Sequence, residues 1–198
     1  MRKFTKRIDE STISSIDPDI VDTLVSKLQK AFAEEINAWY GYIIVSKFLV
    51  GKERSEIAEF FEDAAKDEYE DHAMWLLERI NQLGKSPRDV LTLNSINNIA
   101  PHKYICPFFC EDKADVMNAL KINLKNEEGA IETYNDLEKF TRDIDVVTNR
   151  KIKDILGDEQ EHHTKIQEFI DDLSASGVYP EKDVPTCGCD SCCRSDCW

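Results

Sequence analysis

Four long stretches of the chain carry apolar side chains at alternating steps of three and four residues. This spacing returns to the same side of an α-helix at every turn, so each stretch predicts a helix with one buried apolar face. Only seven Gly and six Pro are present, which leaves little material for the turns of an all-β fold. The sequence therefore predicts an all-α four-helix bundle. The four apolar stripes run from Leu24 to Val45, from Ile57 to Leu83, from Val116 to Leu137 and from Ile152 to Leu173.

The residues at the helix ends indicate how the helices are connected. Asp17 followed by Pro18 is typical of a helix start, and Gly84 is typical of a helix end. Residues 85–112 then contain three of the six prolines, although residues 88–93 could form a short helix. The other two connections are short, which makes their helices antiparallel neighbours. We therefore expect one long crossover between the second and third helices.

The chain divides by composition into three parts. Residues 1–17 form a basic N-terminal arm, residues 18–178 form the bundle, and residues 179–198 form a cysteine-rich C-terminal tail. A chain of 198 residues suits one domain with a substantial core. The tail holds five of the seven cysteines, which are dense enough to bind a soft metal ion through thiolates or could belong to a plain reducible tail.

The overall charge and hydropathy exclude some classes of protein. A net charge of -14 argues against wrapping a nucleic acid over most of the surface and favours attraction of metal cations. No stretch approaches the roughly 20 consecutive apolar residues that cross a bilayer, and the first ten residues lack the apolar core of a signal peptide. We therefore expect a cytoplasmic protein without a membrane partner. In that compartment, seven cysteines are more naturally thiols, metal ligands or redox groups than a disulfide framework.

Charged side chains interrupt each stripe at positions where the spacing predicts an apolar residue. Burying an unpaired carboxylate is costly, so several carboxylates on converging faces need a shared cation. Neighbouring Glu34 and Glu128 face away from the stripes. Oxygen donors with a few nitrogens suit iron or manganese, so the set predicts a dinuclear metal site. The inward residues are Glu35 on the first helix, Glu68 and His72 on the second, Glu127 on the third, and Glu159 and His162 on the fourth.

The stretches around these residues resemble the ferritin superfamily over about residues 20–175. Residues 158–162 are similar to the second Glu-x-x-His motif of the family, and residues 126–134 are similar to its third-helix block. Glu35 with Ala38 is similar to the first-helix pattern, and residues 72–80 are similar to the second-helix block of bacterioferritins. The resemblance implies a ferritin-like bundle that binds two iron ions per subunit, with manganese as an alternative, through Glu35, Glu68, His72, Glu127, Glu159 and His162.

The resemblance also implies an activity and an assembly. The expected protein is a ferroxidase that oxidises Fe(II) with peroxide or oxygen, stores iron and protects against oxidative stress. We expect Glu68 and Glu127 to bridge the two ions, with Glu35 and His72 at one ion and Glu159 and His162 at the other. A homo-oligomeric cage is implied, with a dodecamer favoured.

The second helix departs from the family pattern. The family has Glu three residues before the histidine, whereas Tyr69 stands there and Glu68 lies four residues before His72. Four is still a same-face spacing, so either a local helical bulge or an altered site is expected. Glu70 stands where a haem-binding bacterioferritin would have Met, so no haem is expected.

Cys106 and Cys110 lie in the crossover just before the third helix, an arrangement that resembles the thioferritins, Dps-like relatives with a cysteine pair near the iron site. A thiol close to a helix start has a lowered pKa, so a redox role is possible on physical grounds, with two ordinary loop thiols as the alternative.

Two other functions remain open at this stage. A rubrerythrin-like peroxidase uses a similar bundle, but the chain lacks the two Cys-x-x-Cys motifs of a rubredoxin-type iron centre. A DNA-coating or metal-sequestering protein would depend on the basic arm and the cysteine tail.

Overall fold

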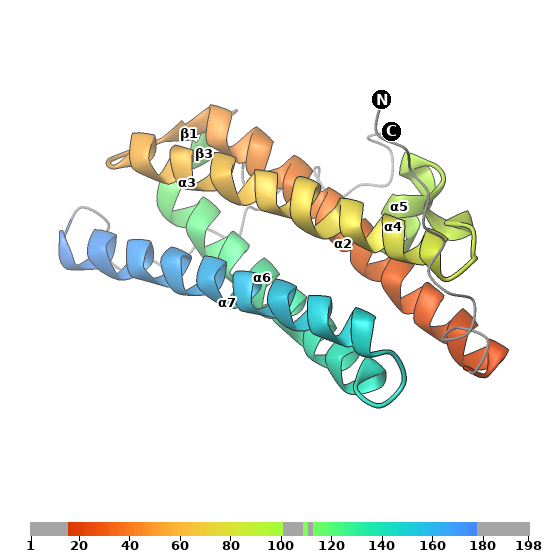
Figure 1. Cartoon of the computed structure of the whole chain (residues 1–198). Helices are drawn as coiled ribbons and strands as arrows, with labels where there is room; N and C mark the ends of the chain where they lie inside the picture. Colours follow the sequence, from red (N-terminus) through yellow and green to blue (C-terminus); the bar gives the residue numbers. More distant parts are fainter. Residues whose placement is uncertain (1–15, 101–108, 111–112, 178–198) are drawn as a thin grey trace, which may run out of the picture.

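The computed structural model describes residues 16–100, 109–110 and 113–177, and it confirms the predicted all-α bundle with one long crossover (Figure 1). Asp17 accepts a hydrogen bond from the Asp19 backbone and caps the first helix at the predicted start. The first helix is α2 (Pro18–Phe48), the second consists of α3 (Arg54–Lys66), η1 (Asp67–Ala73) and α4 (Met74–Gln82), the third is α6 (Val116–Thr141), and the fourth is α7 (Val146–Ala175).

The four helices pack as two antiparallel pairs. The first helix lies along the three segments of the second, and α6 lies along α7, so that the two pairs form two layers (Figure 1). Two separate apolar clusters fill the space between the layers. One contains Leu28 and Leu76, and the other contains Val45 and Leu120. On every helix, the charged residues of the predicted site fall between the stretches that supply these two clusters.

The crossover contains a short helix. The sequence allowed a short helix over residues 88–93, and the structure has a 3-10 turn, η2 (Arg88–Val90), followed by α5 (Leu93–Ile99). The hydroxyl of Thr92 accepts a hydrogen bond from the Ser95 backbone at 3.1 Å and caps α5. Asn37 on α2 donates a hydrogen bond to the backbone carbonyl of Ala100, which ties the end of α5 to the bundle.

Three short strands form a small sheet at one end of the bundle. They are β1 (Leu49–Val50), β2 (Phe109–Cys110) and β3 (Lys113–Asp115), in the order β1-β3-β2. The β1–β3 pair is parallel and the β2–β3 pair is antiparallel. Strands of two or three residues are too short to show an alternating pattern, so the sequence did not predict them.

At the other end, a buried ion pair joins α4 to the turn between α6 and α7. The Arg79 guanidinium contacts the Asp145 carboxylate at 2.6 Å and donates to the Thr148 hydroxyl at 2.8 Å. Asp145 also accepts hydrogen bonds from the Val147 and Thr148 backbone and caps α7. The same carboxylate therefore fixes the start of α7 and the position of α4.

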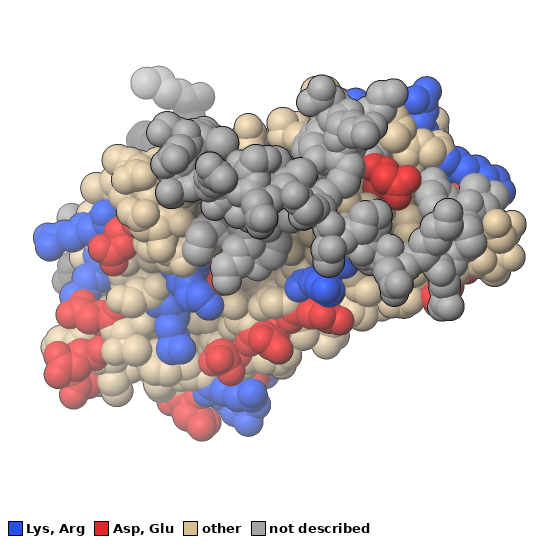
Figure 2. Space-filling view, turned by 180° about the vertical axis from the view of Figure 1, so that it is seen from behind, with Lys and Arg blue, Asp and Glu red and all other residues tan. Residues whose placement is uncertain are grey.

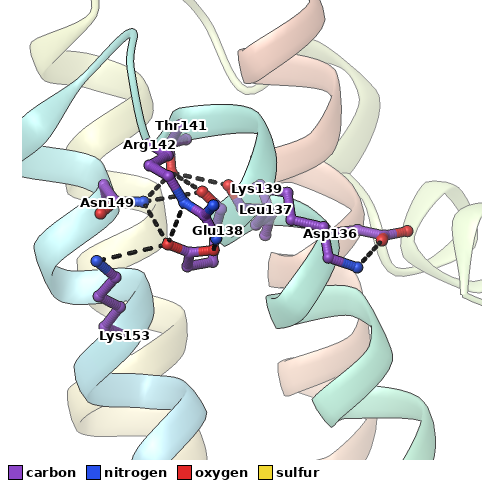
Figure 3. A network of polar contacts seen from close by, with 8 residues as sticks. All are labelled: Asp136, Leu137, Glu138, Lys139, Thr141, Arg142, Asn149 and Lys153. Carbon is purple, nitrogen blue, oxygen red and sulfur yellow. Dashed lines mark hydrogen bonds and ion pairs between the residues drawn. The ribbon is translucent and has the colours of Figure 1, made fainter.

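A second polar network surrounds Glu138 beside the same turn (Figure 3). Arg142 donates to the Glu138 carboxylate at 2.6 Å, and Lys153 lies 3.4 Å from it. The hydrogen bond from Arg142 holds the pKa of Glu138 at about 2. Asn149 on α7 donates to the Glu138 backbone carbonyl at 2.8 Å, which links α7 to the last turns of α6. Among the described residues, no helix is long and apolar enough to cross a membrane.

Candidate metal centre

The structure brings the six side chains predicted to bind metal together between the two apolar clusters. They come from four helices, and none of them is more than 7 % exposed. Their ligand atoms fall into two groups, within each of which all atoms lie within 4.8 Å of one another. The first group is Glu35, Glu68, His72 and Glu159, and the second is Glu68, Glu127, Glu159 and His162.

The two groups share Glu68 and Glu159, whereas the expected bridging residues were Glu68 and Glu127. The reason is that Glu68 and Glu159 each reach the histidine of the opposite helix. Glu68 Oε1 lies 3.4 Å from His162 Nδ1, and Glu159 Oε1 lies 3.2 Å from His72 Nδ1. Glu127 belongs to the second group alone. The grouping therefore favours Glu159 over Glu127 as the second shared residue, and the bridging roles stay a prediction.

The second ring nitrogen of each histidine, Nε2, faces away from the centre and contacts an aspartate. His72 Nε2 lies 3.3 Å from Asp158 Oδ2, and His162 Nε2 lies 3.5 Å from Asp67 Oδ2. Such contacts favour the tautomer with a proton on Nε2, which leaves Nδ1 free to bind a metal ion. Sequence reasoning missed both aspartates, although each directly precedes a glutamate of the centre in an Asp-Glu pair.

Tyr134 is a further buried residue at the centre. Its phenol donates a hydrogen bond to Glu35 Oε1, and its side chain is 1 % exposed. Burial and the Glu35 charge raise the pKa of Tyr134 well above its usual value, so the phenol keeps its proton. The hydrogen bond fixes one oxygen of Glu35 and leaves Oε2 at 3.5 Å from His72 Nδ1.

The close carboxylates change the protonation of the centre. Burial and the neighbouring Glu68 raise the pKa of Glu35 to about 8. Burial and the neighbouring Glu159 raise the pKa of Glu127 well above its usual value. For His162, burial lowers the pKa, but the contacts with Glu68 outweigh it and raise the pKa to about 9. Protons thus supply positive charge among these carboxylates at neutral pH, which is the role that metal ions would take over.

Four atoms of the second group have no hydrogen-bond partner among the described residues, although all are buried. The contacts of 3.2 Å and 3.4 Å with the histidine rings compensate the charge only in part, and burial without hydrogen bonds is costly, so cations that bind these atoms would lower the cost. The donor set of carboxylate oxygens with imidazole nitrogens fits iron or manganese. The four atoms are Glu68 Oε1, Glu127 Oε1, Glu159 Oε1 and His162 Nδ1.

The centre can be approached from two sides. A cavity of about 250 Å³ reaches it from between α2 and α6, past Gly41 and Gly129. A groove of about 730 Å³ lies between the second helix and α7 and includes Asp67, Asp158 and His162. Acidic side chains dominate the groove, so it attracts cations toward the centre.

Other residues from the sequence predictions are not placed by the structure. Cys106, the basic arm up to residue 15 and the tail from residue 178 lie outside the described residues. The backbone of Cys110 lies in β2, but its side chain is not among those described. The redox role of Cys106 and Cys110 stays a prediction.

The comparison with known proteins agrees with the fold. The family model of the ferritin-like domain matches residues 25–176. The chain belongs to the ferritin-like family. The match covers all six centre residues of this ferritin-like chain, and the resemblance seen in the sequence is confirmed. No curated protein sequence matches it.

Several solved structures resemble this ferritin-like protein. The thioferritin from Bacteroides fragilis, a bacterioferritin-related protein described as dodecameric, is 26% identical, with a TM-score of 0.74 over 85% of this chain and 97% of that one. Dps from Mycobacterium smegmatis is 19% identical, with a TM-score of 0.72 over 86% and 99% of the two chains. A ferritin-like, diiron-carboxylate protein from Bacillus anthracis is 22% identical, with a TM-score of 0.63 over 78% and 99%.

Proposed function

We propose that this protein is a di-iron ferroxidase that oxidises Fe(II) with peroxide or oxygen and stores the oxidised iron, with manganese as the alternative ion. The second group at the centre carries the proposal, because its four buried donor atoms lack hydrogen-bond partners in the described part of the chain. The names of two relatives, a thioferritin and a diiron-carboxylate protein, support it. This activity would protect a cell against oxidative stress by removing Fe(II) and peroxide together.

The geometry suggests a role for each side chain. Glu68 and Glu159 would bridge the two ions, because both belong to both groups. The remaining pairs would each complete one ion, Glu35 with His72 and Glu127 with His162. Two Fe(II) ions bound there would supply two electrons, which with two protons convert one hydrogen peroxide into two water molecules. The apolar clusters on both sides limit the access of bulk water.

Iron oxidation without a reductase tests this proposal. We expect the purified protein, loaded with Fe(II) under anaerobic conditions, to oxidise two Fe(II) per chain on addition of one equivalent of peroxide. An anomalous-scattering map at the iron edge should show two peaks among the six side chains. A requirement for an electron-donor protein would instead favour a rubrerythrin-like peroxidase, and the lack of any peak would contradict the di-iron assignment.

The assembly is part of the proposal. The dodecameric relative from Bacteroides fragilis supports a homo-oligomeric cage for this chain as well, with a dodecamer favoured. A DNA-coating role has less support. On the face seen in Figure 2, Lys and Arg side chains lie among Asp and Glu and form no continuous basic surface in the described part of the chain. The basic arm that would serve such a role lies outside the described residues.

Asp158 is expected to strengthen metal binding although it lies outside the two ligand groups. Changing Asp158 to Ala removes the carboxylate beside His72 Nε2, so the ring loses the contact that keeps Nδ1 directed at the centre. We expect metal affinity to fall about 10–100-fold. Calorimetric titration of the metal-free protein with Fe(II) under anaerobic conditions measures the change. Asp154→Ala, an exposed position one turn earlier on α7, is the control and should bind as the wild type does. Equal affinities for the two variants would contradict the role of Asp158.

A further inference from the structure

The second helix departs from α-helical geometry where it supplies the centre. The segment η1 (Asp67–Ala73) is a π-helix, in which the Met74 N–H bonds to the Tyr69 carbonyl five residues earlier. This segment carries Glu68 and His72, separated by three residues. On α7, which is α-helical throughout, Glu159 and His162 are separated by two residues. The two helices therefore differ by one residue in the same motif.

The added residue lies in the turn between Glu68 and His72. Both side chains are buried at the centre although they are four residues apart, and the hydrogen bond across five residues in this segment gives the turn one residue more than an α-helical turn. Beyond it, the buried residues again follow the three- and four-residue steps of an α-helix, at Leu76, Arg79, Ile80 and Leu83. The residues between Glu68 and His72 are all exposed, so the additional residue lies on the outer surface.

The added residue does not disturb the equivalence of the two motifs at the centre. His72 on the second helix contacts Asp158 of α7, and His162 on α7 contacts Asp67 of the second helix. The Nδ1 atoms of the two rings lie 3.1 Å and 3.4 Å from the two oxygens of Glu68. Each motif thus supplies an aspartate, a glutamate and a histidine in corresponding positions.

We infer that one residue between Glu68 and His72 is an insertion and that the π turn is the positioning element that absorbs it. A π turn adds one residue to a single turn and returns the chain to its previous register. Without it, each residue after the insertion would be rotated by about 100° around the helix axis. Leu76 and Ile80, both fully buried, would then leave the apolar core. The π turn keeps the core contacts of α4 and the direction of His72 at the same time.

Two single-residue deletions test the inference. Deleting Glu70, which is exposed inside η1, restores the Glu-x-x-His spacing and should convert the π turn into α-helix. Glu62 lies in α3, which is α-helical and contains no π turn. Its deletion should therefore rotate Ile57 and Phe61 out of the core. Both changes remove one glutamate, so they alter the net charge equally.

Thermal unfolding of the metal-free variants gives the first comparison. We expect the Glu70 deletion to change Tm by less than about 4 °C and the Glu62 deletion to lower it by more than about 10 °C. Equal Tm values for the two variants, whether high or low, would overturn the inference. This comparison does not depend on any metal.

Metal binding gives the second comparison, which rests on the proposed function. Titration with Co(II) should give the wild-type stoichiometry for the Glu70 deletion, because its glutamate and histidine keep their positions. A stable variant that loses the Co(II) binding seen in the wild type would overturn the positioning role of the π turn. If the wild type itself binds no metal, the proposed function fails. The thermal comparison then still tests whether the π turn absorbs an inserted residue.

Discussion

Replacing Glu127 with Gln should lower the rate of peroxide-driven iron oxidation by more than about 100-fold. Glu127 is 1 % exposed, and its Oε1 atom has no hydrogen-bond partner in the part of the chain that the structure describes. A neutral amide of the same shape fills the space but binds a cation far more weakly than a carboxylate. Because the other five side chains remain, the loss should concern the second group most strongly.

The same variant should be at least as stable as the wild type when metal is absent. Burial and the nearby Glu159 raise the pKa of Glu127, which means that its charge is unfavourable in the metal-free centre. Removing the charge relieves this cost. If the unfolding temperature is higher or unchanged and oxidation is lost, Glu127 is a metal ligand and is not needed for folding.

Glu128→Gln is the matched control for this prediction. Glu128 is the next residue on α6 and is exposed, so its replacement should leave both the oxidation rate and the stability unchanged. Stopped-flow absorbance after mixing Fe(II)-loaded protein with peroxide measures the rate for both variants. If Glu127→Gln reacts as fast as Glu128→Gln, the di-iron assignment is wrong.

The helices and the buried carboxylates could be predicted because both follow from local periodicity. Glu35 continues the spacing between Phe32 and Trp39, and in the structure it is 3 % exposed. The same reasoning holds for the residues of the other three helices. The start of α2 at Pro18 and its cap at Asp17 also depend only on neighbouring residues. A pattern of this kind needs no knowledge of the partner helices.

Contacts between distant residues could not be predicted in the same way. The sequence places both Glu127 and Glu159 on inner faces, but only the packing of helix against helix decides which of them reaches both histidines. In the crossover, the prolines indicated irregular structure, yet the Thr92 cap and packing against α2 stabilise the short helix α5. The π turn could be predicted in part. The unusual Glu-x-x-x-His spacing indicated a bulge or an altered site, and the backbone shows the bulge.

Replacing Asp145 with Ala should destabilise the metal-free protein by about 3–5 kcal/mol, because it leaves the buried Arg79 guanidinium without its partner. The substitution also removes the cap of α7, where Asp145 accepts hydrogen bonds from the Val147 and Thr148 backbone. Urea unfolding followed by circular dichroism measures the loss. Lys139→Ala, which breaks the exposed ion pair to Asp136 seen in Figure 3, should leave the urea midpoint nearly unchanged.

The pH dependence provides a second test of the Asp145 prediction. Burial raises the pKa of Asp145, but hydrogen bonds from Arg79 and Thr148 outweigh it and hold the pKa below its usual value. A carboxylate with a lowered pKa in the folded state stabilises the protein above its unfolded pKa, and this contribution is lost as the pH falls through the folded value. The difference between wild type and Asp145→Ala should therefore be full at neutral pH and shrink in acid. A difference that stays constant into the acid range would show that the ion pair with Arg79 is not its cause.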